Sequence, residues 1–247
     1  MKLALETPTK LLTGIQPLGD FDFALTHLIL KDKVYAQYYK DSTRFKILDN
    51  STNEKLKPCS LQDIKRAADI IKPDLVVAPD FLGNSKATIA ALEDFIKVFS
   101  REKTLPVVQG ETTMGVLKCL KASMNFGLNC IAVPYDICCQ REDSLEHMAE
   151  TRVRVVNAII REVPIGFKIH LLGMTTLEEL GQHNRSWVTS VDTGSPILHG
   201  LNELRYGRDS LLDKTLPTYN KMVKFTSYKR HMSSIYYNLA YLRKLLN

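Results

Sequence analysis

No run of about 18 consecutive apolar residues occurs in the chain, and a membrane-crossing helix needs roughly that length. The opening residues, MKLALETPTK, also lack the long apolar core of a signal peptide. Low-complexity linkers are missing as well, and no shift in composition marks a domain boundary before residue 200. We therefore expect a cytoplasmic protein without a membrane partner that folds as one main body.

Cysteine is scarce, with five residues spread along the chain at Cys59, Cys119, Cys130, Cys138 and Cys139. None of them forms a Cys-x-x-Cys pair, and the two adjacent cysteines are too close together for the usual zinc spacing. The six histidines show no metal-ligand spacing either. This pattern favours reduced thiols over a disulfide framework. We expect no bound metal.

The chain has the size of one α/β barrel, because its 247 residues match the roughly 250 that a (β/α)8 barrel takes. Short apolar runs alternate with amphipathic helical patterns, which is typical of a parallel sheet covered by helices. Eight such units predict a single (β/α)8 barrel of the TIM type. The expected strands are Lys2–Leu5, Asp22–Thr26, Phe45–Asp49, Leu75–Pro79, Leu105–Gln109, Cys130–Pro134, Ile169–Gly173 and Val188–Val191.

Apolar residues at helical spacing predict helices between these strands. Two long examples span Ser85–Arg101 and Glu142–Val163. A third begins after the capping residue Ser60 and ends at Ile71. Near the end of the chain, the predicted helices are Pro217–Arg230 and Met232–Leu246.

Positive charge is concentrated in the last part of the chain, where we expect residues 201–247 to form a basic helical segment packed on a barrel of residues 1–200. The net charge is +6, and from Arg205 onward nine basic residues stand against two acidic ones. Aromatic residues are interleaved with these charges, a pattern that suits a nucleic-acid backbone. A solvated helix face is the alternative interpretation. The candidate nucleic-acid-binding residues are Arg205, Arg208, Lys221, Lys224, Lys229 and Arg230.

Polar residues at the carboxyl ends of the strands are the candidates for catalysis, because active sites of such barrels lie there. Asp80 and Asp192 directly follow apolar runs on the fourth and eighth predicted strands, so we expect them to face each other across the barrel mouth. Two carboxylates in different environments are what glycosidic chemistry needs. Either could instead only cap the following helix. His170 lies inside a predicted strand, where a hydrogen-bonded core histidine is the commoner role.

Six short motifs at these strand ends occur in the order found in the tRNA-guanine transglycosylase superfamily. The chain especially resembles the short DNA-modifying relatives in phages and bacteria, over about residues 20 to 200. The motif similar to the family's nucleophile is SVD, ending in Asp192, and the one similar to its base-recognition aspartate is VVAPD, ending in Asp80. The other motifs are ILDNS at 47–51, VQG at 108–110, AVPY at 132–135 and LLGM at 171–174.

The resemblance implies a base exchange in which Asp192 attacks the sugar, guanine leaves, and a 7-deazaguanine of the preQ0 or preQ1 type takes its place. It implies that Asp80 reads the base and moves protons, that Gln109 donates to the O6 side, and that Asn50 and Ser51 hold the base or sugar. No cofactor is needed beyond the deazaguanine co-substrate. The implied substrate-binding residues are Asn50, Ser51, Gln109, Gly110, Tyr135 and Met174.

The chain departs from the tRNA enzymes in three places. Tyr135 replaces the second glycine of the family's AVGG motif, which should reshape the pocket around the exocyclic group of the incoming base. The family's DSGGYQ loop is replaced by NSTNE at residues 50–54, without the glycines and the stacking aromatic residue. Phe21, Phe23 and Tyr135 are the remaining candidates for stacking on the base. The family's Cys-x-Cys-x-x-Cys…His zinc site after the nucleophile is absent, so the resemblance implies DNA rather than tRNA as the partner, and no zinc. A phage-encoded enzyme of this kind would act in the host cytoplasm.

Three other functions remain open from the sequence. The same carboxylates suit a hydrolase that cleaves an N-glycosidic bond with water, and the loss of the loop glycines suits a barrel that binds nucleic acid without catalysis. A tRNA-guanine transglycosylase also remains open, because a basic tail attracts the phosphates of either nucleic acid. The preferred prediction is a DNA-guanine transglycosylase that acts through a covalent aspartyl–glycosyl intermediate.

Overall fold

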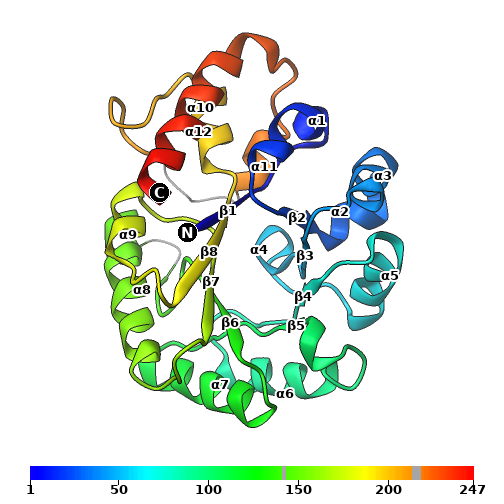
Figure 1. Cartoon of the computed structure of the whole chain (residues 1–247), viewed down its shortest axis with the longest axis vertical. Helices are drawn as coiled ribbons and strands as arrows, with labels where there is room; N and C mark the ends of the chain where they lie inside the picture. Colours follow the sequence, from blue (N-terminus) through cyan, green and yellow to red (C-terminus); the bar gives the residue numbers. More distant parts are fainter. Residues whose placement is uncertain (141–142, 213–217) are drawn as a thin grey trace.

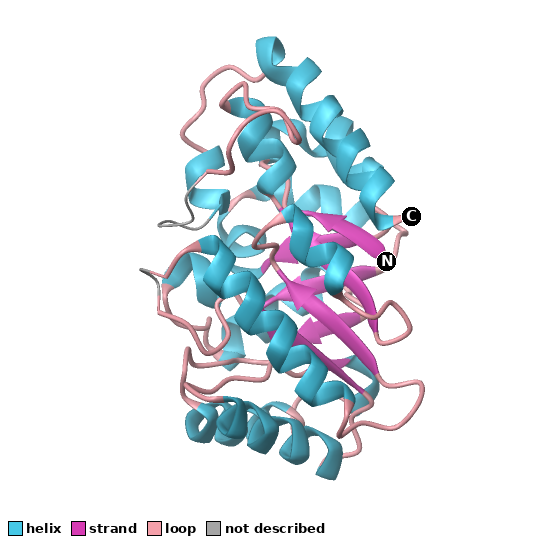
Figure 2. Ribbon diagram, turned by 90° about the vertical axis from the view of Figure 1, so that its left-hand side faces the viewer, coloured by secondary structure: helices cyan, strands magenta, loops and turns pink. Residues whose placement is uncertain are grey.

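The computed structural model describes residues 1–140, 143–212 and 218–247. Within these residues the strands form two four-stranded parallel sheets, in the orders β1-β8-β7-β6 and β2-β3-β4-β5. Figure 2 shows the strands in the interior, flanked by helices. The strands are β1 (Lys2–Leu5), β2 (Asp22–Leu25), β3 (Lys46–Asp49), β4 (Leu75–Val77), β5 (Thr104–Leu105), β6 (Cys130–Pro134), β7 (Lys168–Leu172) and β8 (Val188–Thr193).

Two isolated parallel bridges lie between the sheets. Ala4 of β1 pairs with Phe21, just before β2, and Val107, just after β5, pairs with Ala132 of β6. The edge strands of the two sheets are therefore neighbours on both sides. Because these pairs are parallel, like those within each sheet, the carboxyl ends of strands from both sheets lie at the same end of the molecule.

Apart from the short α4, the helices lie around the outside of the two sheets (Figure 1). They are α1 (Leu12–Ile15), α2 (Thr26–Lys31), α3 (Lys33–Asp41), α4 (Thr52–Lys55), α5 (Leu61–Ile71), α6 (Ser85–Phe95), α7 (Thr113–Asn125), α8 (Leu145–Ile160), α9 (Leu177–Gln182), α10 (Ser195–Leu201), α11 (Thr218–Met222) and α12 (Met232–Leu246). From α3 through α5, α6, α7 and α8 to α9, they follow one another around the strands in chain order. The short α4 is the exception, since it follows β3 directly and contributes to the pocket described below.

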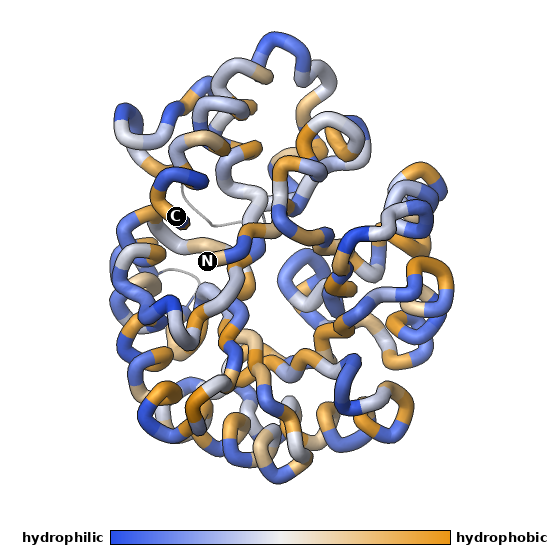
Figure 3. Tube along the Cα trace, in the orientation of Figure 1, coloured by the Kyte–Doolittle hydropathy of each residue, from blue (hydrophilic) through white to orange (hydrophobic). Residues whose placement is uncertain are grey.

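Amphipathic helices and buried strands explain this arrangement. In α5, Ile64 and Ile71 are buried on the apolar face of the helix. Ser60 caps the same helix by accepting a hydrogen bond from the Asp63 N–H. Every residue of β2 and β3 is buried, as expected for strands covered by helices. Figure 3 shows hydrophobic and hydrophilic residues alternating along the outer helices.

The C-terminal segment shares the core of the rest of the chain. Helix α12 packs against α10 so closely that a Cβ added at Gly200 would lie 2.5 Å from Ile235 Cγ1. The buried Asn238 of α12 donates to the carbonyls of Pro196 and Leu204 and accepts from the Tyr206 N–H. These contacts tie α12 to α10 and to the turn that follows α10.

The eight predicted strands are all present, and most ends agree within two residues. The largest difference is β5, where the prediction ran to Gln109 but the ladder stops at Leu105. Pro106 has no N–H to donate, and beyond it Val107 makes only the isolated bridge. The helix predicted for Ser85–Arg101 ends at Phe95.

The helix predicted for Pro217–Arg230 is wrong over most of its length. Helix α11 ends at Met222, and only a short 3-10 turn forms at Lys229–His231. The hydroxyl of Tyr228 donates to the carbonyl of Met222, so the chain folds back over the end of α11. Pro217 itself, and the predicted helix start at Glu142, lie outside the described residues; α8 begins at Leu145.

No helix among the described residues combines the length and the apolar character that crossing a membrane requires.

Candidate functional site

A pocket opens at the carboxyl ends of the strands and is lined by residues that follow strands of both sheets. Its most unusual feature is the number of acidic side chains in its wall. Asp80 and Asp192, predicted from the sequence to face each other, both line it, as do Asn50, Tyr135 and Met174. The acidic residues of the lining are Glu6, Asp49, Glu54, Asp80, Asp136 and Asp192.

Asp192 lies on β8 and is held by partners from β7. His170 Nε2 lies 3.0 Å from Asp192 Oδ1, and the backbone N–H of Gly173 donates to the same oxygen at 3.2 Å. The other ring nitrogen of His170 lies 2.9 Å from Ser190 Oγ. A neutral imidazole that donates to Asp192 can accept the hydroxyl proton of Ser190, so all three side chains fit one hydrogen-bonded chain.

The position of His170 modifies the expectation from the sequence. It is buried and hydrogen-bonded, as a core histidine should be, but its partner is the candidate nucleophile. The ring of Phe23 stacks on that of His170 at a centroid distance of 6.0 Å with 29° between the planes. Phe23 also lines the pocket. The strand-internal position gave no sign of this contact, because it depends on the register of β7 against β8.

Glu6 is a site residue that sequence reasoning missed. It directly follows β1, and its backbone N–H donates to the carbonyl of Thr193 at the end of β8. Burial raises the pKa of Glu6 well above its usual value, and the carboxylates of Asp192 and Glu54 raise it further. A hydrogen bond with Asp192 acts in the same direction. The signal was a charged residue at the end of the first apolar run, in the same position that drew attention to Asp80.

Two further carboxyls with raised pKa values lie in the segment after β3. Burial raises the pKa of Asp49 well above its usual value, with Glu54, Asp192 and Asp80 adding to the effect. Burial also raises the pKa of Glu54, to about 7. One oxygen of Glu54, Oε2, is buried without a hydrogen-bond partner among the described residues. Glu54 can therefore hold a proton near neutral pH, and burial favours the neutral form of Asp49 as well.

Asp80, in contrast, is surrounded by hydrogen-bond donors. Its Oδ1 accepts from Asn50 Nδ2 and Thr52 Oγ1, both at 2.8 Å, and its Oδ2 accepts from Gln109 Nε2 at 2.6 Å. Burial raises the pKa of Asp80, and these three bonds oppose the rise. A carboxylate offers about four acceptor sites, so roughly one remains for a donor on a ligand.

Asn50 and Gln109 are both occupied in holding Asp80. Asn50 also donates to the Ala78 carbonyl and accepts from the Thr52 N–H, while Gln109 accepts from the Gly83 N–H. Gln109 and Gly110 do not line the main pocket; they line a neighbouring one. Direct contact of Gln109 with a base in the main pocket is therefore not part of this arrangement.

Gly110 and Ser51 make contacts within the protein rather than with the main pocket. A Cβ at Gly110 would lie 2.7 Å from the backbone nitrogen of Val116, so only glycine fits against the start of α7. Ser51 has a left-handed backbone with φ of 63°, and its hydroxyl lies 2.9 Å from His27 Nδ1. Ser51 is absent from the pocket lining, so its predicted contact with the substrate has no support in this geometry.

The remaining predicted contacts lie on the wall formed by β6 and β7. Tyr135 lines the pocket, and its hydroxyl donates to Asn53 Oδ1 at 3.3 Å. Gly173 has a φ of 70°, and a Cβ there would come within 3.1 Å of the Tyr135 ring. Of the aromatic residues proposed to stack on a base, Phe23 and Tyr135 line the pocket and Phe21 does not.

The basic residues predicted to bind nucleic acid lie in the C-terminal segment, and none of them lines the main pocket. Arg205 and Arg208 pack over the ring of Tyr237, at 5.3 and 5.5 Å from its centroid. Lys221 and Lys224 line a separate surface pocket. Exposed side chains suited to a phosphate contact are Arg208, Lys224, Lys229 and Arg230.

The aromatic residues interleaved with these charges serve the core. Tyr206, Tyr219 and Tyr228 are all buried, so they are not available to stack on bases. Tyr236 is exposed, and Phe225 is half-buried. The burial of these three tyrosines leaves the basic side chains of the segment, rather than its tyrosines, as the candidates for contact with nucleic acid.

Comparison with known proteins identifies no relative. The chain matches no protein family and no curated protein. The transglycosylase resemblance, carried by short motifs, therefore stays a prediction. What bears on function is the pocket itself: a carboxylate held by a histidine, a second carboxylate held by amide donors, and protonatable carboxyls between them.

Proposed function

We propose that the two sheets close into a (β/α)8 barrel and that the protein is a DNA-guanine transglycosylase. The bridges Ala4–Phe21 and Val107–Ala132, at the two places where the sheets meet, support closure. The observation that carries the function is that Asp192 and Asp80 line one pocket in contrasting surroundings. Such a pair supplies a nucleophile at the sugar and an acceptor for a base.

The first half of the reaction transfers the sugar to the protein. A 2′-deoxyguanosine swung out of its strand enters the pocket. A carboxylate oxygen of Asp192 attacks C1′, and the C1′–N9 bond breaks with its electron pair going to guanine. Glu6 gives its proton to the departing base, since Glu6 lies beside Asp192 and its pKa is raised by burial. Free guanine and a covalent aspartyl–deoxyribose ester result.

The second half reverses these steps with a different base. A 7-deazaguanine occupies the site that guanine left, and its N9 attacks C1′. The proton on N9 passes to the Glu6 carboxylate, and the C1′–oxygen bond breaks to restore the Asp192 carboxylate. Two displacements at C1′ retain the configuration of the glycosidic bond. All groups involved belong to the chain or to the two bases, so the cycle uses no cofactor.

Asp80 serves base recognition in this proposal rather than proton transfer. Its three hydrogen bonds favour the ionised form and leave about one acceptor site for a base N–H. Guanine and 7-deazaguanines carry such donors at N1 and the 2-amino group. Phe23 or Tyr135 would stack on the base, and the exposed cations of the C-terminal segment would contact phosphates.

Base exchange is tested directly with labelled guanine. DNA and, separately, tRNA carrying radiolabelled guanine are incubated with the protein, with and without preQ0. We expect label to be released from DNA only when preQ0 is present. Release from tRNA alone would contradict the choice of DNA, and no release from either would contradict the enzymatic function.

A hydrolase that cleaves the N-glycosidic bond is the second candidate. It is favoured by the protonatable Glu6 and Glu54 in the pocket, because a carboxylate that has given up its proton can activate water. Label released from DNA at the same rate with and without preQ0 would support the hydrolase and contradict the exchange.

A further inference from the structure

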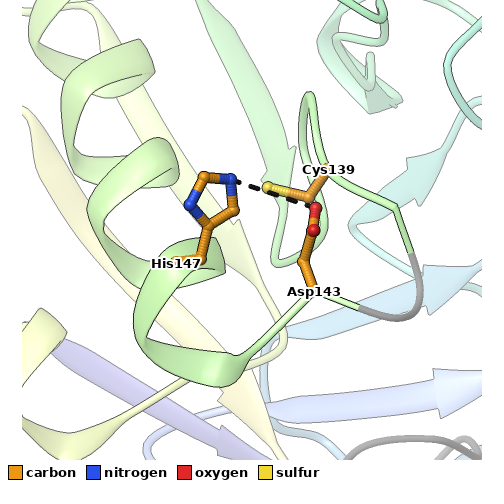
Figure 4. Close-up of side chains that lie close together, drawn as sticks. All are labelled: Cys139, Asp143 and His147. Atoms are coloured by element: carbon orange, nitrogen blue, oxygen red, sulfur yellow. Dashed lines mark ion pairs between the residues drawn. The ribbon is translucent and has the colours of Figure 1, made fainter.

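Three side chains of different chemistry gather between β6 and the first turn of α8, outside the carboxylate pocket. Cys139, Asp143 and His147 each direct one possible ligand atom to the cluster, and these atoms all lie within 4.8 Å of one another. Figure 4 shows the three side chains converging, with His147 Nε2 3.9 Å from Asp143 Oδ2. All three are reachable from solvent: Cys139 and Asp143 are half-buried, and His147 is exposed.

The spacing of these atoms is close to that of a tetrahedral metal site. Metal–ligand distances of about 2.0 to 2.3 Å place the ligands of such a site about 3.3 to 3.8 Å apart. The atoms here need to approach by at most about 1.5 Å to reach this geometry. Side-chain rotations supply movements of that size in partly exposed residues.

Hydrogen bonds hold the described residues on each side of the cluster. Ser144 caps α8 by accepting from the His147 N–H at 3.2 Å, which sets the position of the histidine on the first turn. Asp143 Oδ2 accepts from the Gln140 N–H at 2.8 Å, and the Cys139 N–H donates to the Asp136 carbonyl. These bonds hold the residues that carry the ligand atoms, which lowers the entropic cost of binding.

We propose that Cys139, Asp143 and His147 form a binding site for one zinc ion. Thiolate and imidazole are the ligands that favour zinc among the common divalent cations, and a carboxylate completes three protein ligands. The fourth position is left for water or another ligand, as in zinc sites that exchange ligands. Zinc binding replaces the thiol proton of Cys139 by the metal, and the proton goes to solvent.

The site was not visible in the sequence, from which we predicted no metal. The spacing Cys-x-x-x-Asp-x-x-x-His contains a carboxylate between the thiol and the imidazole, so neither the cysteine pattern nor the histidine pattern shows it. The site has a structural consequence as well. Cys139 lines the neighbouring pocket that Gln109 also lines. The segment that carries Cys139 begins with Tyr135 and Asp136, which line the main pocket. A bound metal would attach this segment to α8.

Cobalt(II) is the probe for this proposal, because its thiolate complexes absorb in the near ultraviolet and its tetrahedral complexes absorb strongly in the visible. Untagged protein, stripped with a chelator, is titrated with Co²⁺ and then with Zn²⁺ as competitor. We expect one Co²⁺ per chain, a thiolate-to-cobalt band, and its loss on addition of Zn²⁺. Because the metal displaces the thiol proton of Cys139, apparent affinity should rise with pH.

Variants assign the ligands. Cys139→Ser should lose the thiolate band, and Asp143→Asn or His147→Ala should weaken Zn²⁺ binding by about tenfold or more, since even losing a partner of a ligand costs about 10- to 100-fold. Cys138→Ser is the matched control, because Cys138 is the adjacent half-buried thiol and lies outside the cluster. Each variant is compared with the unchanged protein by thermal unfolding in chelator, where the Tm values should agree.

A second measurement needs no variant. Bound Zn²⁺ should protect Cys139 from alkylation in the unchanged protein, while Cys138 stays reactive, as read by peptide mass. The proposal is overturned if Co²⁺ binding gives no thiolate band, if Cys138→Ser rather than Cys139→Ser removes it, or if Zn²⁺ leaves the alkylation of Cys139 unchanged. None of these outcomes depends on base exchange.

Discussion

Asp192 and Asp80 line the same pocket, but their partners are of different kinds. Asp192 contacts a histidine, a backbone N–H and the protonatable Glu6. Asp80 contacts two side-chain amides and a hydroxyl, Asn50, Gln109 and Thr52, none of which titrates near neutral pH. The direct partners of Asp192 can therefore move protons, and the direct partners of Asp80 can hold a fixed acceptor.

The two sets of partners suit two different kinds of chemistry. A nucleophile that is alternately free and esterified needs neighbours that tolerate both states. A histidine and a carboxylic acid can redistribute protons as the nucleophile passes between these states. A group that selects a base needs a constant charge and a constant position. The variants below test whether this division between the two sides holds.

Asp192→Asn should have the largest effect. Exchange should fall by about 10⁴-fold or more, as expected for loss of a nucleophile, while an amide oxygen still accepts from the Gly173 N–H and the fold stays intact. Labelled-guanine release and the far-ultraviolet circular dichroism spectrum measure the two effects. Asp63→Asn, on the exposed face of α5, is the control. Exchange that persists in Asp192→Asn would disprove its role as nucleophile.

Asp80→Asn should damage recognition and stability together. The new amide places donors opposite donors, so we expect a loss of about 1 to 3 kcal/mol in the free energy of unfolding. One lost hydrogen bond to the base should lower kcat/KM by about 10- to 150-fold, on the basis of about 1.5 to 3 kcal/mol for a charged partner. Urea unfolding and exchange kinetics measure the two losses. If Asp192→Asn is the less stable of the two variants, the contrast between the sides is wrong.

His170→Ala tests the proton-moving side without removing the nucleophile. We expect kcat to fall by about 10- to 100-fold, the value of one charged hydrogen bond, while KM for the deazaguanine changes little. Ser190→Ala keeps the histidine and removes only its second partner, so its effect should be smaller. A rise in KM at unchanged kcat would show that His170 shapes the base site rather than positioning Asp192.

Glu54→Gln should change the pH dependence of stability. The pKa of Glu54 is raised to about 7, so the folded protein binds this proton more tightly than the unfolded chain. Stability from the neutral carboxyl is complete below the ordinary value of 4.5 and is lost as the pH rises through about 7. The variant should match the unchanged protein at pH 4 and exceed it at pH 8 by up to about 3 kcal/mol in urea unfolding. Glu93→Gln, on the exposed face of α6, should show no such difference.

Lys224→Ala combined with Lys229→Ala should have the smallest effect on chemistry and a specific effect on salt dependence. If both cations contact phosphates, the slope of log affinity against log salt should decrease by about 2, while kcat at saturating DNA stays unchanged. Fluorescence anisotropy with DNA at several salt concentrations measures the slope. Lys97→Ala, in the turn after the outer helix α6, is the control. An unchanged slope would remove this segment from the DNA interface.

The order of strands and helices could be predicted from the sequence, because it depends on local patterns. Apolar runs such as Cys130–Pro134 give strands, and Ser60 gives a helix cap, through interactions between residues close in the chain. The prediction failed where a distant contact decided the outcome. Tyr228 folds back onto Met222 and ends a helix that local propensity would have continued.

For the candidate site, position in the sequence identified Asp80 and Asp192 but not their surroundings. Glu6 lies at a strand end as visibly as they do, yet only the pairing of β1 with β8 brings it beside Asp192. Ser51 looked like a substrate contact because of its place in a motif. Its left-handed backbone turns its hydroxyl toward His27 instead.

Local patterns in the sequence were enough to predict the alternation of strands and helices, the concentration of basic residues near the end, and the carboxylates at strand ends. These follow from side-chain chemistry and the periods of helix and strand. Three contacts could be found only in the tertiary structure. His170 contacts Asp192, three donors hold Asp80, and Cys139 lies close to Asp143 and His147. Register between strands and the rotation of helices set these contacts, and both depend on packing between residues far apart in the chain.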